Sequence, residues 1–311
     1  MQETGTGGPR WARLVAGTAL VVIPIAVTVL AWSALIVNDW AYPVTLAASL
    51  LLGTVLLASS LWTRSKPRPG RIRTFLRWAA AMAGVGFAAL LWWTKPLLAE
   101  PVALDAIASD SAVVVEQSRS AITFTPTTDA PAGLVLYPGG GVDPRAYAAQ
   151  AREIAEQGFD VVIVKCPYDL ALLCPAAAAD YKTWDQPGAV GGHSLGGVEA
   201  GDDINRDLGF DGLLLWASYP RFDLSDRGDV TVASIFGSAD TLASPEKVDD
   251  HRDLLPTETA YTRIEGGIHS FFGDYGLQPG DGTPTTDRDT AQAEIVAASV
   301  QLLERLIAQA D

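Results

Sequence analysis

The stretch Gly191-Gly192-His193-Ser194-Leu195-Gly196-Gly197 decides how the rest of the chain is interpreted. It follows the short apolar run Ala189-Val190, leads into a segment of helical character and matches the pattern G-x-S-x-G. A serine on a sharp strand-to-helix turn has a strained backbone, and only small neighbours let the chain pass close by. The N-terminus of the following helix provides positive potential where an oxyanion would form. The pattern predicts a nucleophilic serine; a glycine-rich turn with an incidental serine is the alternative.

The charge of the chain is divided between two different segments. Residues 1–100 carry nine Lys/Arg and three Asp/Glu, a net charge of +6, whereas residues 101–311 have a net charge of −20. Seven of the nine tryptophans also precede residue 100, so the two segments differ in more than charge. Contacts to phosphate groups require clustered basic side chains, and the acidic segment has no such cluster. We therefore expect no nucleic-acid partner.

Three apolar runs predict a membrane segment over residues 1–99. Leu14–Val37 is a charge-free run of 24 residues and Ala41–Trp62 one of 22, and a helix needs roughly 20 residues to cross a bilayer. A third run, Trp78–Thr94, has 17 residues and is flanked by basic residues whose long stems can reach the interface. The predicted spans are about 14–37, 41–62 and 77–94, which makes a lipid bilayer the expected partner of this segment. A cleaved signal peptide is the alternative for the first run, although 24 apolar residues are long for one.

Basic residues predict the orientation of these spans. Arg10 and Arg13 precede the first run, and the loop Asn38-Asp39 after it has no basic residue. The loop before the third run holds six basic residues, Arg64, Lys66, Arg68, Arg71, Arg73 and Arg77. By the positive-inside rule the N-terminus and this second loop are cytoplasmic. Three crossings then place everything after Lys95 outside the cytoplasm; if the third run does not cross, the acidic segment is cytoplasmic.

The acidic segment alternates strand-like and helical runs. Residues 100–111 are expected to form a linker, and 112–311 a single domain. Two β-branched stretches, residues 112–118 and 121–125, predict an antiparallel edge. Further strands are expected at residues 133–137, 159–164, 188–192, 212–217, 230–236 and 260–264, and helices at 145–157, 195–208, 246–254 and 290–308. Strands that are apolar on both faces and alternate with helices predict an α/β domain with a mostly parallel sheet covered on both sides.

A nucleophilic serine needs a base, most often a histidine that a carboxylate orients. The chain has three histidines. His193 adjoins Ser194 in the turn and is expected to point away from its hydroxyl, and His251 lies in a charged stretch typical of a solvated helix face. His269 follows the last strand in a glycine-loosened loop, at a strand end where open α/β sheets build their sites. Elimination and position therefore predict His269 as the base; a structural loop histidine is the alternative.

Asp240 is the expected orienting carboxylate. It comes directly after a strand, at the end of the small-residue approach Phe236-Gly-Ser-Ala-Asp240. Its competitors lie in polar runs typical of solvated turns: Asp223, Asp226, Asp229 and Glu246. The chain order Ser194, Asp240, His269 is also the order of triads in α/β hydrolases.

Two backbone N–H groups are expected to bind the oxyanion. Leu195, the residue after the nucleophile, supplies one. The other is expected from Gly139-Gly140-Gly141, which permit close backbone approach, and we favour Gly140. A tight turn before a helix also explains three glycines, and both explanations can hold together.

Cys166 and Cys174 lie eight positions apart, just after a predicted strand. They have neither CxxC spacing nor a matched histidine, so we expect no metal site there. On an exported domain they are candidates for a disulfide that closes a small loop, with two buried free thiols as the alternative. No metal or cofactor is expected elsewhere either, because the acidic runs 274–281 and 287–289 are more typical of solvated loops than of a cation site.

With these residues assembled, residues 112–308 resemble the α/β-hydrolase superfamily, in particular a compact branch related to dienelactone hydrolases whose members often carry N-terminal membrane spans. The resemblance rests on the stretches 137–147, 191–197, 217–220, 236–240 and 264–269, with the tail 272–282. It implies a serine hydrolase that forms an acyl-enzyme, with Ser194, Asp240 and His269 at the matching positions. Dienelactone hydrolases proper use a cysteine nucleophile, so the resemblance predicts the reaction class rather than that substrate.

One feature departs from the pattern of this superfamily. The helix after the nucleophile normally packs inside the fold, yet here it carries Glu199, Asp202 and Asp203. These acids predict a less buried helix or a helix whose end turns outward.

The sequence thus predicts a multi-pass membrane protein with an extracytoplasmic α/β-hydrolase domain. Its expected activity is that of a serine hydrolase, a carboxylesterase-like enzyme that cleaves a carboxylic ester or related acyl bond of a small molecule. A non-catalytic, membrane-tethered binding or scaffold module that retains the fold is the alternative.

Overall fold

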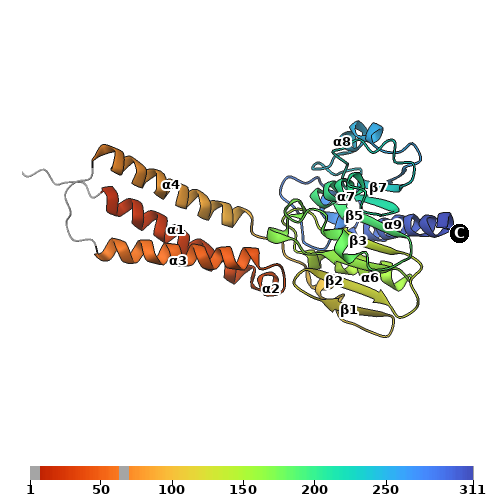
Figure 1. Cartoon of the computed structure of the whole chain (residues 1–311), viewed down its shortest axis with the longest axis horizontal. Helices are drawn as coiled ribbons and strands as arrows, with labels where there is room; N and C mark the ends of the chain where they lie inside the picture. Colours follow the sequence, from red (N-terminus) through yellow and green to blue (C-terminus); the bar gives the residue numbers. More distant parts are fainter. Residues whose placement is uncertain (1–7, 63–69, 311) are drawn as a thin grey trace, which may run out of the picture. The chain divides into compact units, whose positions relative to one another are not determined.

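The computed structural model describes residues 8–62 and 70–310, and it divides into two compact units. The first unit comprises the chain as far as Ile36 together with Trp40–Lys95; the second comprises Val37–Asp39 together with the chain from Pro96 onward. Figure 1 shows the elements of both units with the labels used below. The basic residues Arg64, Lys66 and Arg68, which contribute to the predicted orientation, lie outside the described residues.

The first unit consists of the helices α1 (Gly8–Leu30), α2 (Trp32–Leu35), α3 (Ala41–Trp62) and α4 (Arg71–Trp93). Three of these helices are long and apolar enough to cross a membrane, over Trp11–Leu30, Ala41–Leu61 and Arg71–Trp93. α1 packs against both α3 and α4. The backbones of α1 and α3 come close where Gly17 meets Gly53, since a Cβ on Gly17 would lie 3.0 Å from the Gly53 carbonyl oxygen. Small residues at a crossing are typical of helices that associate in membranes.

Two helices of this unit differ from the predicted spans. The first ends at Leu30, because Ala31 has φ −111° and ψ 18°, outside the helical region, and α2 follows as a separate helix. The third begins at Arg71, ahead of the apolar run that starts at Trp78. The predicted span, which rests on hydropathy alone, leaves out the first turns of α4 because they contain basic residues. Long basic side chains can extend away from the axis of an apolar helix. With 23 residues α4 is about 35 Å long, enough for the roughly 30 Å hydrocarbon core.

An eight-stranded sheet forms the centre of the second unit, in the order β1-β2-β4-β3-β5-β6-β7-β8. Its strands are β1 (Val113–Gln117), β2 (Ala121–Pro126), β3 (Gly133–Tyr137), β4 (Asp160–Val164), β5 (Gly188–His193), β6 (Gly212–Trp216), β7 (Thr231–Gly237) and β8 (Ala260–Ile264). β2 is antiparallel to both β1 and β4, and the other neighbours are parallel. The predicted α/β fold with an antiparallel edge and a mostly parallel sheet is confirmed.

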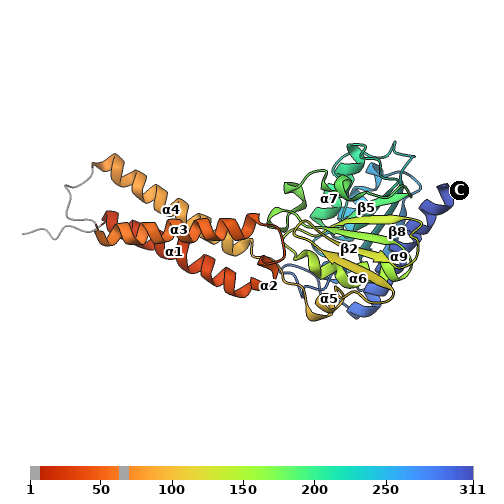
Figure 2. The ribbon, with the colours of Figure 1, turned by 60° about the horizontal axis from the view of Figure 1, so that its bottom comes forward.

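Helices cover both faces of this sheet (Figure 2). They are α5 (Pro101–Asp105), α6 (Ala148–Glu156), α7 (Leu195–Asn205), α8 (Pro245–Asp250) and α9 (Arg288–Ala310). Alternate residues of one strand belong to different cores: Leu134 and Leu136 pack with α5, α6 and α9, whereas Val135 and Tyr137 pack with α7 and the chain around Cys166. The segment predicted as a linker, residues 100–111, contains α5, whose Ala103 is fully buried in the first of these cores.

Glycines allow β5 and α7 to approach each other closely at the strand-to-helix turn. A Cβ on Gly192 would lie 2.2 Å from the Gly196 carbonyl carbon, and a Cβ on Gly196 would lie 2.3 Å from the Tyr137 carbonyl oxygen. Real Cβ atoms essentially never come this close to backbone, and backbone atoms in a packed sheet cannot yield as a flexible side chain can. The pattern in the sequence is therefore a steric requirement of this turn.

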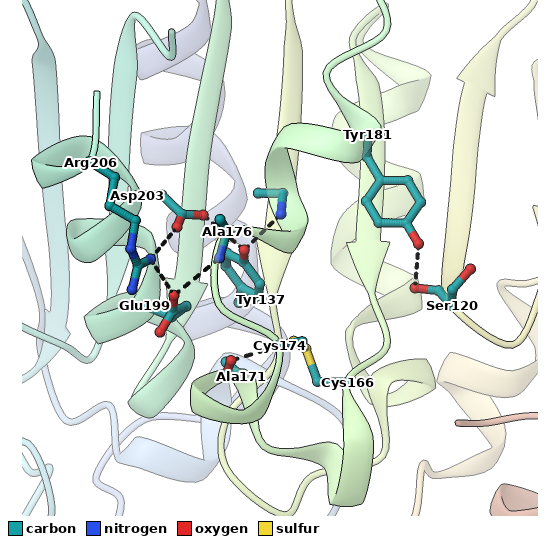
Figure 3. The surroundings of a disulfide bond; sticks show 11 residues. Ser120, Tyr137, Cys166, Ala171, Cys174, Ala176, Tyr181, Glu199, Asp203 and Arg206 are labelled. Atoms are coloured by element: carbon teal, nitrogen blue, oxygen red, sulfur yellow. Dashed lines mark hydrogen bonds and ion pairs between the residues drawn. A yellow bond between two sulfur atoms is a disulfide. The ribbon is translucent and has the colours of Figure 1, made fainter. Parts of the chain in front are cut away.

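The acids of α7 are buried, contrary to the expectation that they would loosen the helix or turn its end outward. Glu199, Asp202 and Asp203 are each at most 1% exposed. Arg206 pairs with Glu199 at 2.6 Å and with Asp203 at 2.7 Å, as Figure 3 shows, and Arg221 pairs with Asp202. Arg206 and Arg221 thus balance the negative charge of these acids. The expectation of an exposed helix considered the acids without these partners.

Two hydrogen bonds of Tyr137 connect the acids of α7 to the segment that contains Ala178 (Figure 3). Tyr137 Oη donates to Asp203 Oδ2 at 2.8 Å and accepts from the Ala178 N–H at 2.7 Å. The pKa of Asp203 is raised to about 6, mainly by burial and also by the Glu199 charge, against the lowering effect of the hydrogen bonds from Tyr137 and Arg206. The folded protein therefore binds the Asp203 proton more tightly than the unfolded chain does.

We predict that substitution by alanine is tolerated at one glycine of α7 and not at another. Gly196→Ala should lower the free energy of unfolding by about 3 kcal/mol, because its methyl group would meet backbone. Gly201→Ala is the matched control: its Cβ would lie 3.4 Å from Pro220 Cβ, and alanine favours the helix, so stability should change by less than about 1 kcal/mol. Thermal unfolding of the detergent-solubilised full-length protein measures both. Equal losses would contradict the steric argument.

We also predict a pH-dependent effect of Asp203→Asn. A raised carboxyl pKa gives stability that is complete below pH about 4 and is lost as the pH rises through about 6. From pH 4 to 7 the asparagine variant should therefore gain on the wild type by up to about 3 kcal/mol, since it has no proton to lose. Urea unfolding over this pH range tests the trend, with Asp226→Asn, an exposed position, as the control. A pH-independent difference for Asp203→Asn would contradict it.

Candidate active site

Ser194 occupies the turn between β5 and α7. Its φ of 53° and ψ of −121° give a non-glycine residue a positive φ, the strain expected of a nucleophile on a sharp turn. Two hydrogen bonds hold this conformation: Ser194 N–H donates to the Trp216 carbonyl at 2.9 Å, and Ser218 Oγ donates to the Ser194 carbonyl at 2.7 Å. The Ser194 side chain is half-buried, and the residue is the N-cap of α7.

His269 and Asp240 are in direct contact. His269 Nδ1 lies 2.8 Å from Asp240 Oδ2, and both residues are almost fully buried. The other carboxylate oxygen of Asp240 accepts the N–H groups of Leu242 at 2.7 Å and Ala243 at 2.8 Å. A carboxylate that accepts several N–H groups is held in one orientation. It accepts a hydrogen bond from the Nδ1–H of His269, which leaves Nε2 as the nitrogen that can accept a proton from elsewhere.

Asp281 fixes the loop that carries His269. Its Oδ1 accepts the His269 N–H at 3.1 Å, and its Oδ2 accepts the N–H of Ser270 at 2.7 Å and the Ser270 hydroxyl at 2.6 Å. Asp274 is buried, where Gln150 and Gln292 donate to it at 3.0 Å and 3.2 Å. The prediction of solvated loop over residues 274–281 is wrong for Asp274.

The glycine loop after β3 presents one free amide. Gly139 N–H donates to Tyr147 Oη at 2.8 Å, and Gly141 N–H donates to the Asp169 carbonyl at 2.8 Å. Within residues 8–62 and 70–310, neither Gly140 N–H nor Leu195 N–H has a hydrogen-bond partner. The two residues adjoin, since a Cβ on Gly140 would lie 2.6 Å from Leu195 Cδ1. Two unpartnered donors therefore lie beside the serine, where an anionic oxygen can bind.

The other two histidines, His193 and His251, make contacts outside the pair formed by His269 and Asp240. His193 points away from the serine: its Nδ1 is 2.8 Å from Tyr147 Oη, and its ring lies 4.4 Å from the His269 ring, centroid to centroid. His251 stacks on Tyr219 at 4.2 Å and its Nδ1 is 2.7 Å from the Lys247 carbonyl oxygen, next to α8. The contact between His193 and Tyr147 was not predicted, because the two residues are 46 positions apart.

The structure joins Cys166 and Cys174 by a disulfide. The bond closes the loop that contains Asp169, whose carbonyl holds the amide of Gly141. It therefore belongs to the surroundings of the glycine loop. Among the described residues no group of three or more His, Cys, Asp or Glu is arranged as metal ligands would be.

No hydrogen bond joins Ser194 Oγ to His269 in the part of the chain that the structure describes. Catalytic hydrogen bonds are often long without substrate and tighten in the complex. The strained serine, the paired imidazole and carboxylate, and the two free amides are the parts needed for nucleophilic attack on an acyl carbon.

A family model described as alpha/beta hydrolase family matches residues 133–293, more than half of the chain. The chain belongs to the alpha/beta hydrolase family. The matched residues run from the start of β3 into α9 and thus contain every element of the candidate site. A search of curated proteins found no match.

Solved structures show more distant similarity. TT1662 from Thermus thermophilus is 14% identical, with 63% of this chain and 98% of that chain covered and a TM-score of 0.45. A cold-adapted esterase from an Arctic intertidal metagenomic library is similar in two structures, a PEG-bound complex and the native protein. The first is 13% identical, covering 59% of this chain and 88% of that chain with a TM-score of 0.41. The second is 14% identical, covering 59% and 87% with a TM-score of 0.40.

Proposed function

We propose that this alpha/beta hydrolase is a serine hydrolase that cleaves a carboxylic ester or related acyl bond of a small molecule. The observation that carries the proposal is the buried 2.8 Å contact between His269 Nδ1 and Asp240, in a site that also contains the strained Ser194. A binding module would have no use for an oriented imidazole beside a strained hydroxyl. Membership of a hydrolase family supports the same reaction class.

Each residue has one role in the proposed reaction. Ser194 Oγ attacks the acyl carbon while His269 Nε2 takes its proton, and Asp240 stabilises the imidazolium that forms. The carbonyl oxygen becomes an oxyanion, to which Leu195 N–H and Gly140 N–H donate. His269 then returns the proton to the leaving alcohol, and the acyl group stays on Ser194. Water, deprotonated by His269, releases the acid and restores the hydroxyl.

The free amides account for a large part of the expected rate enhancement. Removing one donor from an oxyanion site typically lowers kcat by about 10²- to 10³-fold. Gly139 and Gly141 already donate to other groups, which favours Gly140 as the second donor. The positive end of α7 adds to the field at the same place.

We predict that a fluorophosphonate probe labels the wild-type protein and not Ser194→Ala. His269→Ala should lower turnover of a short-chain ester by about 10³-fold or more, because general acid–base transfer is lost. His251→Ala is the matched control and should leave turnover unchanged, since that ring contacts Tyr219 and the Lys247 carbonyl rather than a residue of the triad. A wild-type protein that neither reacts with the probe nor cleaves esters, yet is folded, would instead favour the non-catalytic scaffold.

We further propose that α1, α3 and α4 cross a membrane and that the catalytic unit lies outside the cytoplasm. The length and composition of the three helices support the crossings, and the basic residues Arg10 and Arg13 in the first turns of α1 support a cytoplasmic N-terminus. Under this topology Val37–Asp39, after the first crossing, is extracytoplasmic.

Hydrogen bonds within the second unit support three crossings rather than two. Val37–Asp39 belongs to that unit. The Val37 carbonyl accepts from Lys165 Nζ at 2.9 Å, the Asn38 carbonyl from Arg119 at 2.8 Å, and Asn38 Nδ2 donates to Asp143 at 3.2 Å. The catalytic unit must therefore lie on the same side of the membrane as this loop. An even number of crossings then separates the loop from Pro96, which favours crossing by both α3 and α4 over crossing by α3 alone.

The predicted topology can be tested with an added cysteine. A membrane-impermeant maleimide should label Asp226→Cys on intact cells and should label Ser65→Cys, in the second loop, only after permeabilisation. The native cysteines are joined as a disulfide and do not compete for the reagent. The reverse pattern would place the catalytic unit in the cytoplasm.

A further inference from the structure

Tyr147 lies behind the glycine loop and was not part of the predicted site. It ends the short 3₁₀ helix Pro144–Tyr147 and is fully buried. Its hydroxyl makes two contacts, one to the N–H of Gly139 and one to Nδ1 of His193, both at 2.8 Å. It therefore connects the glycine loop to the histidine that precedes the nucleophile.

Hydrogen-bond accounting fixes the direction of both contacts. An amide N–H can only donate, so the Tyr147 oxygen accepts from Gly139. The hydroxyl proton then has His193 Nδ1 as its acceptor, which requires the tautomer of His193 with its proton on Nε2. Burial raises the pKa of Tyr147, and burial together with the neighbouring His269 lowers the pKa of His193 well below its usual value. Both groups are thus neutral at physiological pH.

His193 carries the connection on to the base. Its ring stacks on Phe272 with centroids 5.6 Å apart and planes 9° apart, and its centroid is 4.4 Å from that of His269. A charged ring at this distance would oppose the imidazolium that His269 forms during the reaction. A neutral His193 ring packs against the His269 ring without this electrostatic repulsion.

We propose that Tyr147 and His193 are positioning residues of the hydrolytic site. Tyr147 takes up the amide of Gly139 and so leaves the amide of Gly140 directed at the oxyanion, while His193 keeps the Tyr147 hydroxyl in place and packs against His269. The proposal rests on the proposed function, because it gives these residues a task in the same reaction. Neither residue touches the reacting atoms.

Tyr147→Phe tests the proposal. It removes only the hydroxyl, so Gly139 N–H loses its acceptor and the glycine loop can rotate. We expect kcat for a short-chain ester to fall about tenfold or more, with KM changed less than about twofold, since the loss is confined to the transition state. The affinity for a trifluoromethyl ketone, which forms a tetrahedral adduct with the serine, should weaken by the same factor.

Tyr137→Phe is a matched control. Tyr137 is also fully buried, and its hydroxyl also accepts one backbone N–H, that of Ala178, and donates to one side chain, Asp203. Its loss should affect stability as much as the loss at Tyr147 does, but it should leave kcat and ketone affinity unchanged. Equal kinetic losses in the two variants, or no kinetic loss in Tyr147→Phe, would overturn the proposal.

A measurement without substrate separates this proposal from the proposed function. The chain has three histidines, so ¹⁵N-histidine labelling of the detergent-solubilised full-length protein gives three imidazole spin systems. That of His193, assigned by its absence from His193→Gln, should show an unprotonated Nδ1 that shifts in Tyr147→Phe and not in Tyr137→Phe. A protonated Nδ1 would overturn the positioning network. Failure of the fluorophosphonate to label the wild type would overturn the serine-hydrolase assignment instead.

Discussion

Contact between backbones, with no side chain between them, is the constraint on which the rest of the catalytic unit depends. At Gly192 and Gly196 the end of β5, the start of α7 and the end of β3 come closer than any Cβ allows. This approach forces Ser194 to a positive φ, and it leaves Leu195 N–H in the first turn of the helix without a partner. It also brings the chain after Tyr137 beside the serine. The proposed nucleophile and both proposed oxyanion donors are thus consequences of one steric arrangement.

Several acidic side chains of this unit are buried in its interior. Aspartates and a glutamate with at most 2% exposure occur around the site: Asp143, Glu199, Asp202, Asp203, Asp240 and Asp274. Asp240 accepts three N–H groups, and Glu199 and Asp203 share Arg206. Buried charge is tolerated when it is fully paired, and such groups fix geometry more than they add stability. The net charge of −20 therefore overstates how acidic the surface is.

The sequence predicts the features that depend on neighbouring residues. Strand and helix positions follow from local apolar patterning, and the elbow from glycine spacing. Asp240 and His269 could be proposed because each lies in the loop that follows a strand. Their catalytic roles stay predictions, as does that of Ser194, although the structure places Asp240 and His269 in contact. The support that Asp281 and Tyr147 give could not be predicted, since their hydrogen bonds join residues 8 to 46 positions apart with no characteristic spacing. Likewise, the acids of α7 give no sign of burial until their arginine partners are located.

The loop Val37–Asp39 has a consequence for dissecting the protein. Lys165 is almost fully buried and its ammonium donates to the carbonyls of Val37 and Ser118. A fragment that starts at Pro96 contains the whole sheet, but it deprives Lys165 of one acceptor and leaves Asp143 without the Asn38 amide. Burial already lowers the pKa of Lys165 to about 8, so the loss of a partner makes its charge more costly. The alpha/beta-hydrolase unit is therefore not confined to the chain from Pro96 onward: a turn between α2 and α3 completes its fold.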